Sequence, residues 1–233
     1  MKIDASSPFH KPKDFLKNEA KTVKFLKDDP EIAKHFTRLY SDANSWYSQN
    51  YKQIEKKNLS KFLFESEIDV LLDGREGICH IGAVLIEKSG QFDLMSYYLA
   101  LCEAGNTSLI RKYHFDYARA DKQYRQAPPV YHMQYPGELS GRLKGLQIVD
   151  NQLHPWLSEP RLSFTPMSLA LLLNIVFKEF SSEVSKKIVE RGEWRDLIRN
   201  NEDTILKPYY QNCNRFINSP AGQLITNDFF YGK

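Results

Sequence analysis

The fold is decided by a mostly apolar stretch that runs from Ile78 to Glu87 and has the sequence ICHIGAVLIE. Apolar residues stand at both odd and even positions, which is typical of a central strand covered on both faces. Ser89 and Gly90 follow, and such a pair favours a tight hairpin turn. The next stretch, Gln91 to Glu103, is therefore expected to return antiparallel beside the first.

Strand and turn signals continue on both sides of this hairpin. Glu67 to Leu72 is expected to precede it as a strand, and Ser108 to Tyr117 to follow it as another. Beyond a polar loop, Pro128 and Pro129 lead into a further strand around His132. The pattern predicts an antiparallel meander of about five strands over residues 66–136.

Helical patterns flank the predicted meander at its N-terminal end. Within residues 1–60, one helix is expected from Lys13 to Lys27. A second is expected to begin at Asp29 and Pro30 and to continue to about Lys57. Aspartate caps the free amides of a helix, and proline suits its first position.

Residues 165–218 are expected to be helical as well. Met167 to Phe180 is apolar nearly all round, which in a globular protein indicates a buried helix. Pro208 is expected to kink or break the last helix, from Glu202 to Asn218. No repeat or linker divides the chain, so residues 1–233 are predicted to form a single domain of the α+β class.

Composition narrows the class of protein. The 233 residues are 42% hydrophobic and carry a net charge of only +3, which by itself does not indicate a nucleic-acid-binding protein. The three widely spaced cysteines suit reduced thiols, and no apolar run approaches the ~20 residues of a membrane span. The N-terminus has no apolar signal core. We therefore expect a cytoplasmic protein with no membrane partner.

Two of the predicted strands carry groups with acid-base chemistry. On a strand, alternate residues point to one face, so His114 and Asp116 share a face, as do His132 and Gln134. The hairpin turns predict that Gly82 pairs with Tyr97 and Tyr97 with His114. The sheet face expected from these registers carries His80, Gly82, Tyr97, Lys112, His114 and Asp116.

A pair of histidines can supply both a general base and a general acid near neutral pH. RNA cleavage by its own 2′-hydroxyl group needs these two roles and a cation that stabilises the phosphorane. In this hypothesis of a metal-independent endoribonuclease with no cofactor, the catalytic residues are His114, His132, Asp116, Lys112 and Arg161. The residues that bind the RNA substrate are Tyr97, Tyr131, Gln134, Arg119, Lys122 and Arg125.

Two other roles for these histidines stay open. In the first, His114 and His132 simply form hydrogen bonds with Asp116, Gln134 or backbone carbonyls in a partly buried layer. In the second, His114, Asp116 and His132 bind zinc or manganese, although their spacing matches no recognised metal motif.

A non-catalytic protein is the alternative from another class. Trp46, Tyr47 and Tyr51 are expected to be exposed on the second helix, where they could bind a partner protein together with the basic loop. The sequence has no GxSxG, HExxH or dinucleotide-binding motif, which excludes several common enzyme classes. It does not indicate an oligomeric state.

Four short motifs of the second half occur in a recognisable order: HFDY (114–117), PPVYHMQ (128–134), EPRL (159–162) and PMSL (166–169). From Tyr113 to Phe180, the chain resembles an uncharacterised bacterial family of mobile and defence-associated gene clusters. The resemblance implies a bacterial toxin or defence system and brings no catalytic role. In that context the alternative is a partner-binding subunit of a defence or toxin–antitoxin complex.

Overall fold

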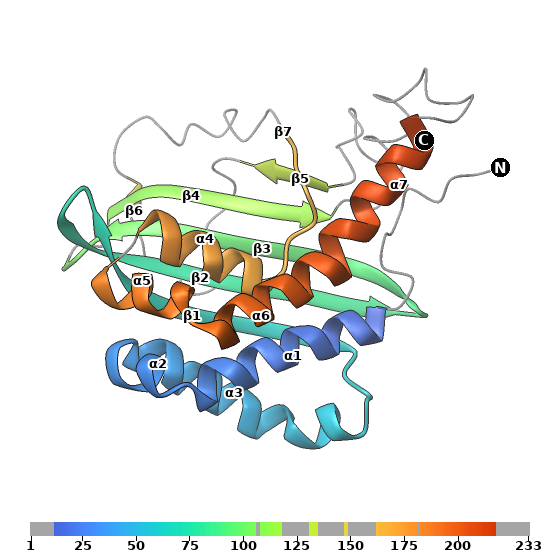
Figure 1. The fold of residues 1–233 in the computed structure, drawn as a ribbon, viewed down its shortest axis with the longest axis horizontal. Helices are drawn as coiled ribbons and strands as arrows, with labels where there is room; N and C mark the ends of the chain where they lie inside the picture. Colours follow the sequence, from blue (N-terminus) through green and yellow to red (C-terminus); the bar gives the residue numbers. More distant parts are fainter. Residues whose placement is uncertain are drawn as a thin grey trace.

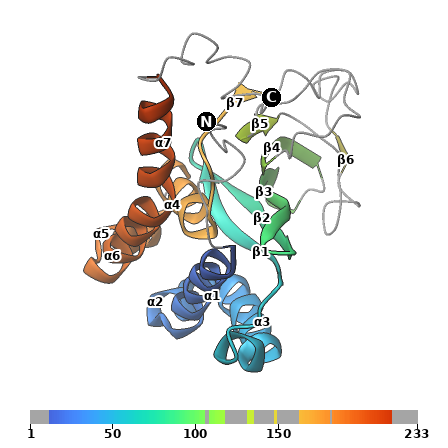
Figure 2. The same ribbon diagram turned by 90° about the vertical axis from the view of Figure 1, so that its right-hand side faces the viewer.

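An antiparallel sheet forms the centre of the protein, and helices from both ends of the chain pack on one of its faces (Figures 1 and 2). The computed structural model describes residues 12–105, 108–117, 131–134, 147–148, 162–180 and 182–217. Its mixed content of helices and antiparallel strands confirms the α+β class.

Five strands follow one another across the sheet as predicted: β1 (Lys61–Leu72), β2 (Arg75–Lys88), β3 (Gln91–Glu103), β4 (Ser108–Tyr117) and β5 (Tyr131–Gln134). Two short strands complete it, β6 (Gln147–Ile148) parallel to β4 and β7 (Leu162–Ser163) antiparallel to β5. The first strand begins at Lys61, earlier than the predicted Glu67. At the β2–β3 turn, Ser89 and Gly90 both have positive φ, 54° and 79°, as a two-residue hairpin of type I′ requires.

The N-terminal helices are α1 (Pro12–Asp28), α2 (Pro30–His35) and α3 (Thr37–Glu55). The C-terminal helices are α4 (Leu169–Glu179), α5 (Glu183–Glu190), α6 (Gly192–Asn201), the π-helical turn η4 (Glu202–Leu206) and α7 (Lys207–Ile217). Among the described residues, no helix combines the length and apolar character needed to cross a membrane.

Asp29 begins α2 as predicted, since its Oδ1 accepts the amides of Glu31 and Ile32 at 2.9 and 3.0 Å. The predicted continuous helix to Lys57 is wrong, because Phe36 leaves the helical conformation with φ −122° and ψ 59°. Its ring packs against Phe177 of α4, at 5.3 Å between centroids. The break lets the chain turn from α2 into α3 while the aromatic side chain enters the core.

Pro208 does not end the last helix. It stands second in α7, directly after the π-helical turn η4. Proline cannot donate the usual helical hydrogen bond, and the wider π turn before it changes the bonding pattern at that point. The sequence therefore identified the position of an irregularity but not its form.

The core lies between the sheet and the helices. The even residues of β1 and the odd residues of β2 point toward the helices, and Phe62, Phe64 and Ile81 are fully buried there. Phe15 of α1 meets Phe92 of β3 edge-to-face at 5.5 Å. The described helices all lie on this side of the sheet (Figure 2). Several side chains of the opposite face, among them Tyr98, Lys112 and His132, are buried as well.

Helix α3 lies along the outer edge of β1 and holds it from both sides. Asp42 accepts a hydrogen bond from Ser66 at 2.8 Å, and Arg38 forms an ion pair with Glu67. Ser66 and Glu67 are consecutive strand residues and so point to opposite faces of the sheet.

A buried carboxyl group joins the two helical regions. The Glu19 side chain is fully buried, and its Oε2 accepts the Leu169 amide at the start of α4 at 2.9 Å. The Tyr97 hydroxyl group lies beside this carboxyl group but outside hydrogen-bond geometry. Burial raises the Glu19 pKa from 4.5 to about 8, against the lowering effects of the Leu169 amide and the Tyr97 hydroxyl group.

Folding of the protein is coupled to the uptake of a proton by the Glu19 carboxyl group. Between pH 4.5 and about 8, folded Glu19 keeps a proton that the unfolded chain has lost, so the stabilisation falls as pH rises through this range. We expect Glu19→Gln, which keeps an acceptor for Leu169, to remove a pH-dependent change on the order of 4 kcal/mol. Urea denaturation of both proteins from pH 5 to 9 measures it. Parallel pH profiles for the two proteins would contradict this account, and Glu202→Gln is the surface control.

Candidate functional site

Two β-bulges determine which side chains share the sheet face opposite the helices. Lys88 pairs with Gln91 as predicted, but a bulge between Ile86 and Glu87 moves the β2–β3 register by one residue. Gly82 therefore faces Tyr98, and the predicted pairing of Gly82 with Tyr97 is wrong. A bulge adds one residue to one strand and so moves alternate side chains to the other face.

The β3–β4 register differs from the prediction by one residue as well. His114 faces Tyr98, and Lys112 faces Ala100. The β2–β3 and β3–β4 registers are each shifted by one residue, and the two shifts cancel between β2 and β4. His114 of β4 and Gly82 of β2 therefore share a face, as predicted. Tyr97, predicted to lie with them, instead points into the helix-covered core.

One row of paired residues crosses the five main strands. It consists of Glu65, Gly82, Tyr98, His114 and Gln134. The Tyr98 hydroxyl group donates to Glu65 Oε1 at 3.0 Å, and its ring centroid lies 6.2 Å from that of His114. A Cβ atom on Gly82 would lie 2.1 Å from Tyr98 Cε1, so only glycine lets the ring lie across β2.

His114 is the basic group of this row, and its pKa is strongly shifted. Burial, together with the nearby charges of Lys112 and His132, lowers its pKa from 6.5 to about 3. Its buried Nε2 atom makes no hydrogen bond with any of the described residues. The imidazole is therefore neutral at neutral pH and keeps a nitrogen lone pair available as a base.

The other predicted acid-base groups flank His114 on the same face. Asp116 pairs with His132 across β4 and β5, two residue pairs away from the pair His114–Gln134. His114 and His132 are thus diagonal neighbours, for which the separation is about 7 to 8 Å. Lys112 is fully buried two residues before His114, an unusual position for an ammonium group.

A second row extends the polar face toward β1. Glu67 pairs with His80, whose Nδ1 lies 3.5 Å from Glu67 Oε1. Glu65, Glu67 and Tyr98 were not identified from the sequence. The alternation of residues 61–72 would have placed both glutamates on one face, had the strand been extended to Lys61.

Several predicted substrate-binding residues lie elsewhere. Tyr131 points away from this face and packs against Tyr117 and Tyr209, at centroid distances of 5.5 and 5.7 Å. Gln134 does lie on the face, opposite His114. The predicted cations Arg119, Lys122, Arg125 and Arg161 lie outside the described residues.

The chemistry of the face is that of acids, bases and a buried cation. Within the described ranges, no cluster of three histidine, cysteine or acidic side chains could hold a metal ion.

The predicted aromatic surface of α3 is smaller than expected. Trp46 is 9% exposed and packs against Phe62 at 4.7 Å, so its predicted exposure is wrong. Tyr51 is exposed, and its hydroxyl group donates to Glu55 at 2.6 Å. Two hydrophobic side chains do reach solvent on the sheet face opposite the helices, where Leu63 and Leu94 are 47% and 39% exposed.

No protein-family model matches this chain, and no curated protein or solved structure matches it either.

We expect Gly82→Ala to disturb the central row, since the new methyl group would displace the Tyr98 ring and break its bond to Glu65. Such overpacking lowers the free energy of unfolding by about 1 to 3 kcal/mol. Gly192→Ala is the control, because no atom lies within 4 Å of a Cβ at that position. Equal stability of the two variants in chemical denaturation would refute the close packing of Tyr98 on Gly82.

We also expect the His114 imidazole to stay neutral in the folded protein down to about pH 4, because its pKa is about 3. Its NMR ring resonances should not shift between pH 8 and 5, whereas those of the urea-unfolded chain should titrate near about 6.5. Because the pKa of His114 is lower in the folded protein than in the unfolded chain, the neutral imidazole contributes to the free energy of unfolding. This contribution is lost as pH falls below about 6.5. A folded-state midpoint above 5 would contradict the burial argument.

Proposed function

We propose that this protein cleaves RNA without a metal ion, using the polar sheet face of β4 and β5. The observation that carries the proposal is the strand register, which sets His114, Asp116 and His132 on one face beside the buried Lys112. General acid-base cleavage needs a neutral base, a protonated acid and a cation within reach of one phosphodiester.

His114 is the general base in this proposal. It is neutral at physiological pH, so its nitrogen can accept the proton of the RNA 2′-hydroxyl group as that oxygen attacks phosphorus. A pKa near 3 makes a weak base in the empty site. The bound phosphodiester offsets the Lys112 charge, which is one of the causes of the low pKa, and so strengthens the base when substrate is present.

His132 is the general acid, which protonates the leaving 5′-oxygen. Asp116 stands directly opposite it in the β4–β5 register, and a neighbouring carboxylate favours the protonated imidazole. The two histidines then exchange roles when the cyclic phosphate product is hydrolysed.

Lys112 stabilises the charged phosphorane. Its full burial places the ammonium group in a setting where an electrostatic interaction is stronger than in water. Tyr98, fixed by Glu65, holds one side of His114, and Gln134 lies on the other side to contact the RNA. Arg119, Lys122, Arg125 and Arg161 are the remaining candidates for phosphate binding.

The setting that we propose is the cytoplasm of a bacterium, in a toxin or defence system, as the resemblance of residues 113–180 implies. In such a system a ribonuclease would restrict growth by degrading cellular RNA. The proposal therefore includes a partner protein that inhibits the ribonuclease.

A non-catalytic subunit is the second candidate, and one observation favours it. The pairings of Leu63 with Val84 and of Ile86 with Leu94 gather four apolar side chains at one end of the sheet face opposite the helices, two of them well exposed. Exposed apolar groups that cluster in this way are typical of protein interfaces. A subunit of this kind would keep its biological effect without the histidines.

The double substitution His114→Ala/His132→Ala should abolish RNA cleavage, by more than about 100-fold, because it removes both proton-transfer groups. Purified wild-type protein should convert end-labelled RNA to fragments with 2′,3′-cyclic phosphate ends, and EDTA should leave the rate unchanged.

His35→Ala is the matched control, because His35 is exposed on α2 and should leave the rate unaltered. Circular dichroism establishes that each variant is folded. If the folded double variant cleaves RNA as fast as the wild type, the ribonuclease proposal fails. If neither protein cleaves RNA but both restrict growth equally, the subunit function replaces it.

A further inference from the structure

One row of paired residues leads from the proposed catalytic groups to an apolar part of the same sheet face. It runs from His132 and Asp116 through Ser96 and Val84 to Leu63 on the outer strand. We call this face, opposite the helices, the histidine face. Neighbouring strands are about 4.8 Å apart, so Val84 lies about 10 Å from Asp116. An RNA whose phosphodiester is bound between the histidines can therefore reach Val84 with a nearby nucleotide.

The apolar side chains at the end of this row form a patch that is open to solvent. The leucine patch, as we call it, consists of Leu63, Val84, Ile86 and Leu94. Its two leucines are 47% and 39% exposed. At its inner border, the Ser96 hydroxyl group has no hydrogen-bond partner among the described residues. An apolar surface beside a free hydroxyl group suits an unpaired base, which has an apolar face and a polar edge.

Two exposed lysines flank the leucine patch. Lys61 pairs with Ile86 across β1 and β2, and Lys88 follows two residues later on the same face of β2. Neither lysine forms an ion pair with another described residue. Phosphate groups on either side of a base at the patch are attracted by these charges.

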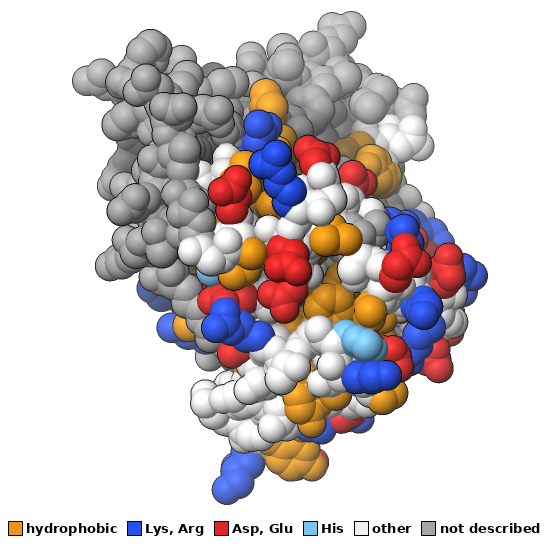
Figure 3. Space-filling model, turned by 90° about the vertical axis from the view of Figure 1, so that its left-hand side faces the viewer, with side chains coloured by type: hydrophobic (Ala, Val, Ile, Leu, Met, Phe, Trp, Pro, Cys, Tyr) orange, Lys and Arg blue, Asp and Glu red, His pale blue; other side chains and the backbone are white. Residues whose placement is uncertain are grey.

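The other end of the histidine face is acidic. Glu65, Glu67 and Asp69 are alternate residues of β1 and so project from this face. Glu76 of β2 lies on it as well, because it pairs with Leu71. Asp69 and Glu76 are exposed and form no ion pair with a described residue. Figure 3 views the molecule from this end, where acidic side chains lie among hydrophobic and uncharged ones.

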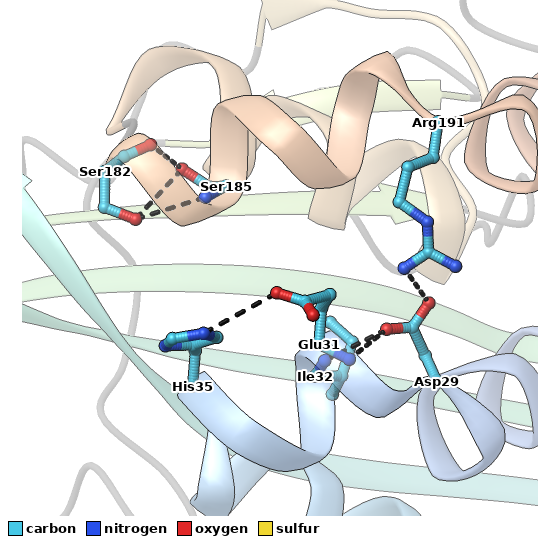
Figure 4. Close-up of polar contacts among 7 residues, drawn as sticks. All are labelled: Asp29, Glu31, Ile32, His35, Ser182, Ser185 and Arg191. Atoms are coloured by element: carbon cyan, nitrogen blue, oxygen red, sulfur yellow. Dashed lines mark hydrogen bonds and ion pairs between the residues drawn. The ribbon is translucent and has the colours of Figure 1, made fainter.

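Polar groups between α2 and α5 contact one another instead. His35 lies 3.6 Å from the Glu31 carboxylate, and Arg191 lies 2.7 Å from Asp29 (Figure 4). Charges that are paired in this way largely cancel at a distance, whereas unpaired charges act on an approaching polyanion. The histidine face therefore attracts RNA toward the leucine patch and repels it from the β1–β2 hairpin.

A double helix does not suit this distribution of charge. Its bases are paired and stacked, so their faces cannot lie on the leucine patch. It carries about twice the charge of a single strand per unit length, and it is too stiff to turn away from the acidic end of the sheet. A single strand is flexible and can follow the row from His132 to Leu63.

We propose that the substrate is single-stranded RNA, held with an unpaired base on the leucine patch and its polar edge at Ser96, and that Asp69 and Glu76 exclude duplex RNA. This inference rests on the ribonuclease function proposed above and specifies its substrate. It assigns binding to one end of the histidine face and exclusion to the other.

The first test compares the cleavage of one end-labelled RNA as a single strand and annealed to its complement. The single strand should be cleaved at least about tenfold faster, because a duplex loses the contact of a base with the patch. Equal rates would overturn the inference and leave the ribonuclease function standing. If neither form is cleaved, the ribonuclease function itself fails, and the inference fails with it.

The second test removes one side chain of the patch. Leu94→Ser should raise KM for the single strand about fivefold with little change in kcat, since it weakens apolar contact far from the reacting atoms. Leu71→Ser is the matched control, because Leu71 is 40% exposed on the same face but at its acidic end. Both changes are at exposed positions and should leave the fold intact. Equal KM values for the two variants would refute binding at the patch.

The third test removes the acidic groups. Asp69→Asn/Glu76→Gln should raise the rate of duplex cleavage about threefold at low salt and leave the single-strand rate unchanged. Glu179→Gln/Glu202→Gln removes the same charge from exposed positions on the helices and should alter neither rate. An equal rise in both double variants would reduce the effect to net charge and overturn the role of Asp69 and Glu76.

Discussion

The hydrogen bond from the Leu169 amide to the Glu19 carboxyl group connects segments that lie 150 residues apart in the chain. Helix α4 is apolar and buried, so its first amides have little access to water and need acceptors from the protein. Ser168 supplies one for Leu171, and Glu19 supplies one for Leu169. The preceding residue, Asn18, donates to Asn201 of α6 at 2.8 Å, so one turn of α1 holds the C-terminal helices in place.

This connection reaches the histidine face through the chain just before α4. Strand β7 pairs with β5, and the Phe164 amide donates to the Tyr131 carbonyl group at 3.0 Å. His132 is the next residue along β5. The position of α4 therefore constrains the strand that carries the proposed general acid, although Glu19 itself is on the other side of the sheet.

Much of the fold could be predicted from the spacing of apolar residues and from the residue types at turns and helix starts. Asp29 and Pro30 marked a helix start, and Ser89 and Gly90 marked a hairpin, because these residues act through local geometry. The two bulges depend on how neighbouring strands twist and pack, and no residue type identifies them in advance. They moved Tyr97 off the predicted face and brought in Tyr98, while His114 and Lys112 kept their predicted side because the two shifts cancelled. The Phe36 break escaped prediction for a similar reason, since it serves a contact with Phe177 far along the chain.

The position of α3 against β1 has a consequence for how this protein behaves at high concentration. A twelve-residue outer strand would otherwise present a row of backbone donors and acceptors to other molecules. Asp42 and Arg38 hold the helix against that strand from its two sides. At Ser66 and Glu67, in the middle of this edge, a helix thus occupies the place that a second strand would need for the strand-to-strand pairing that begins fibrous aggregation.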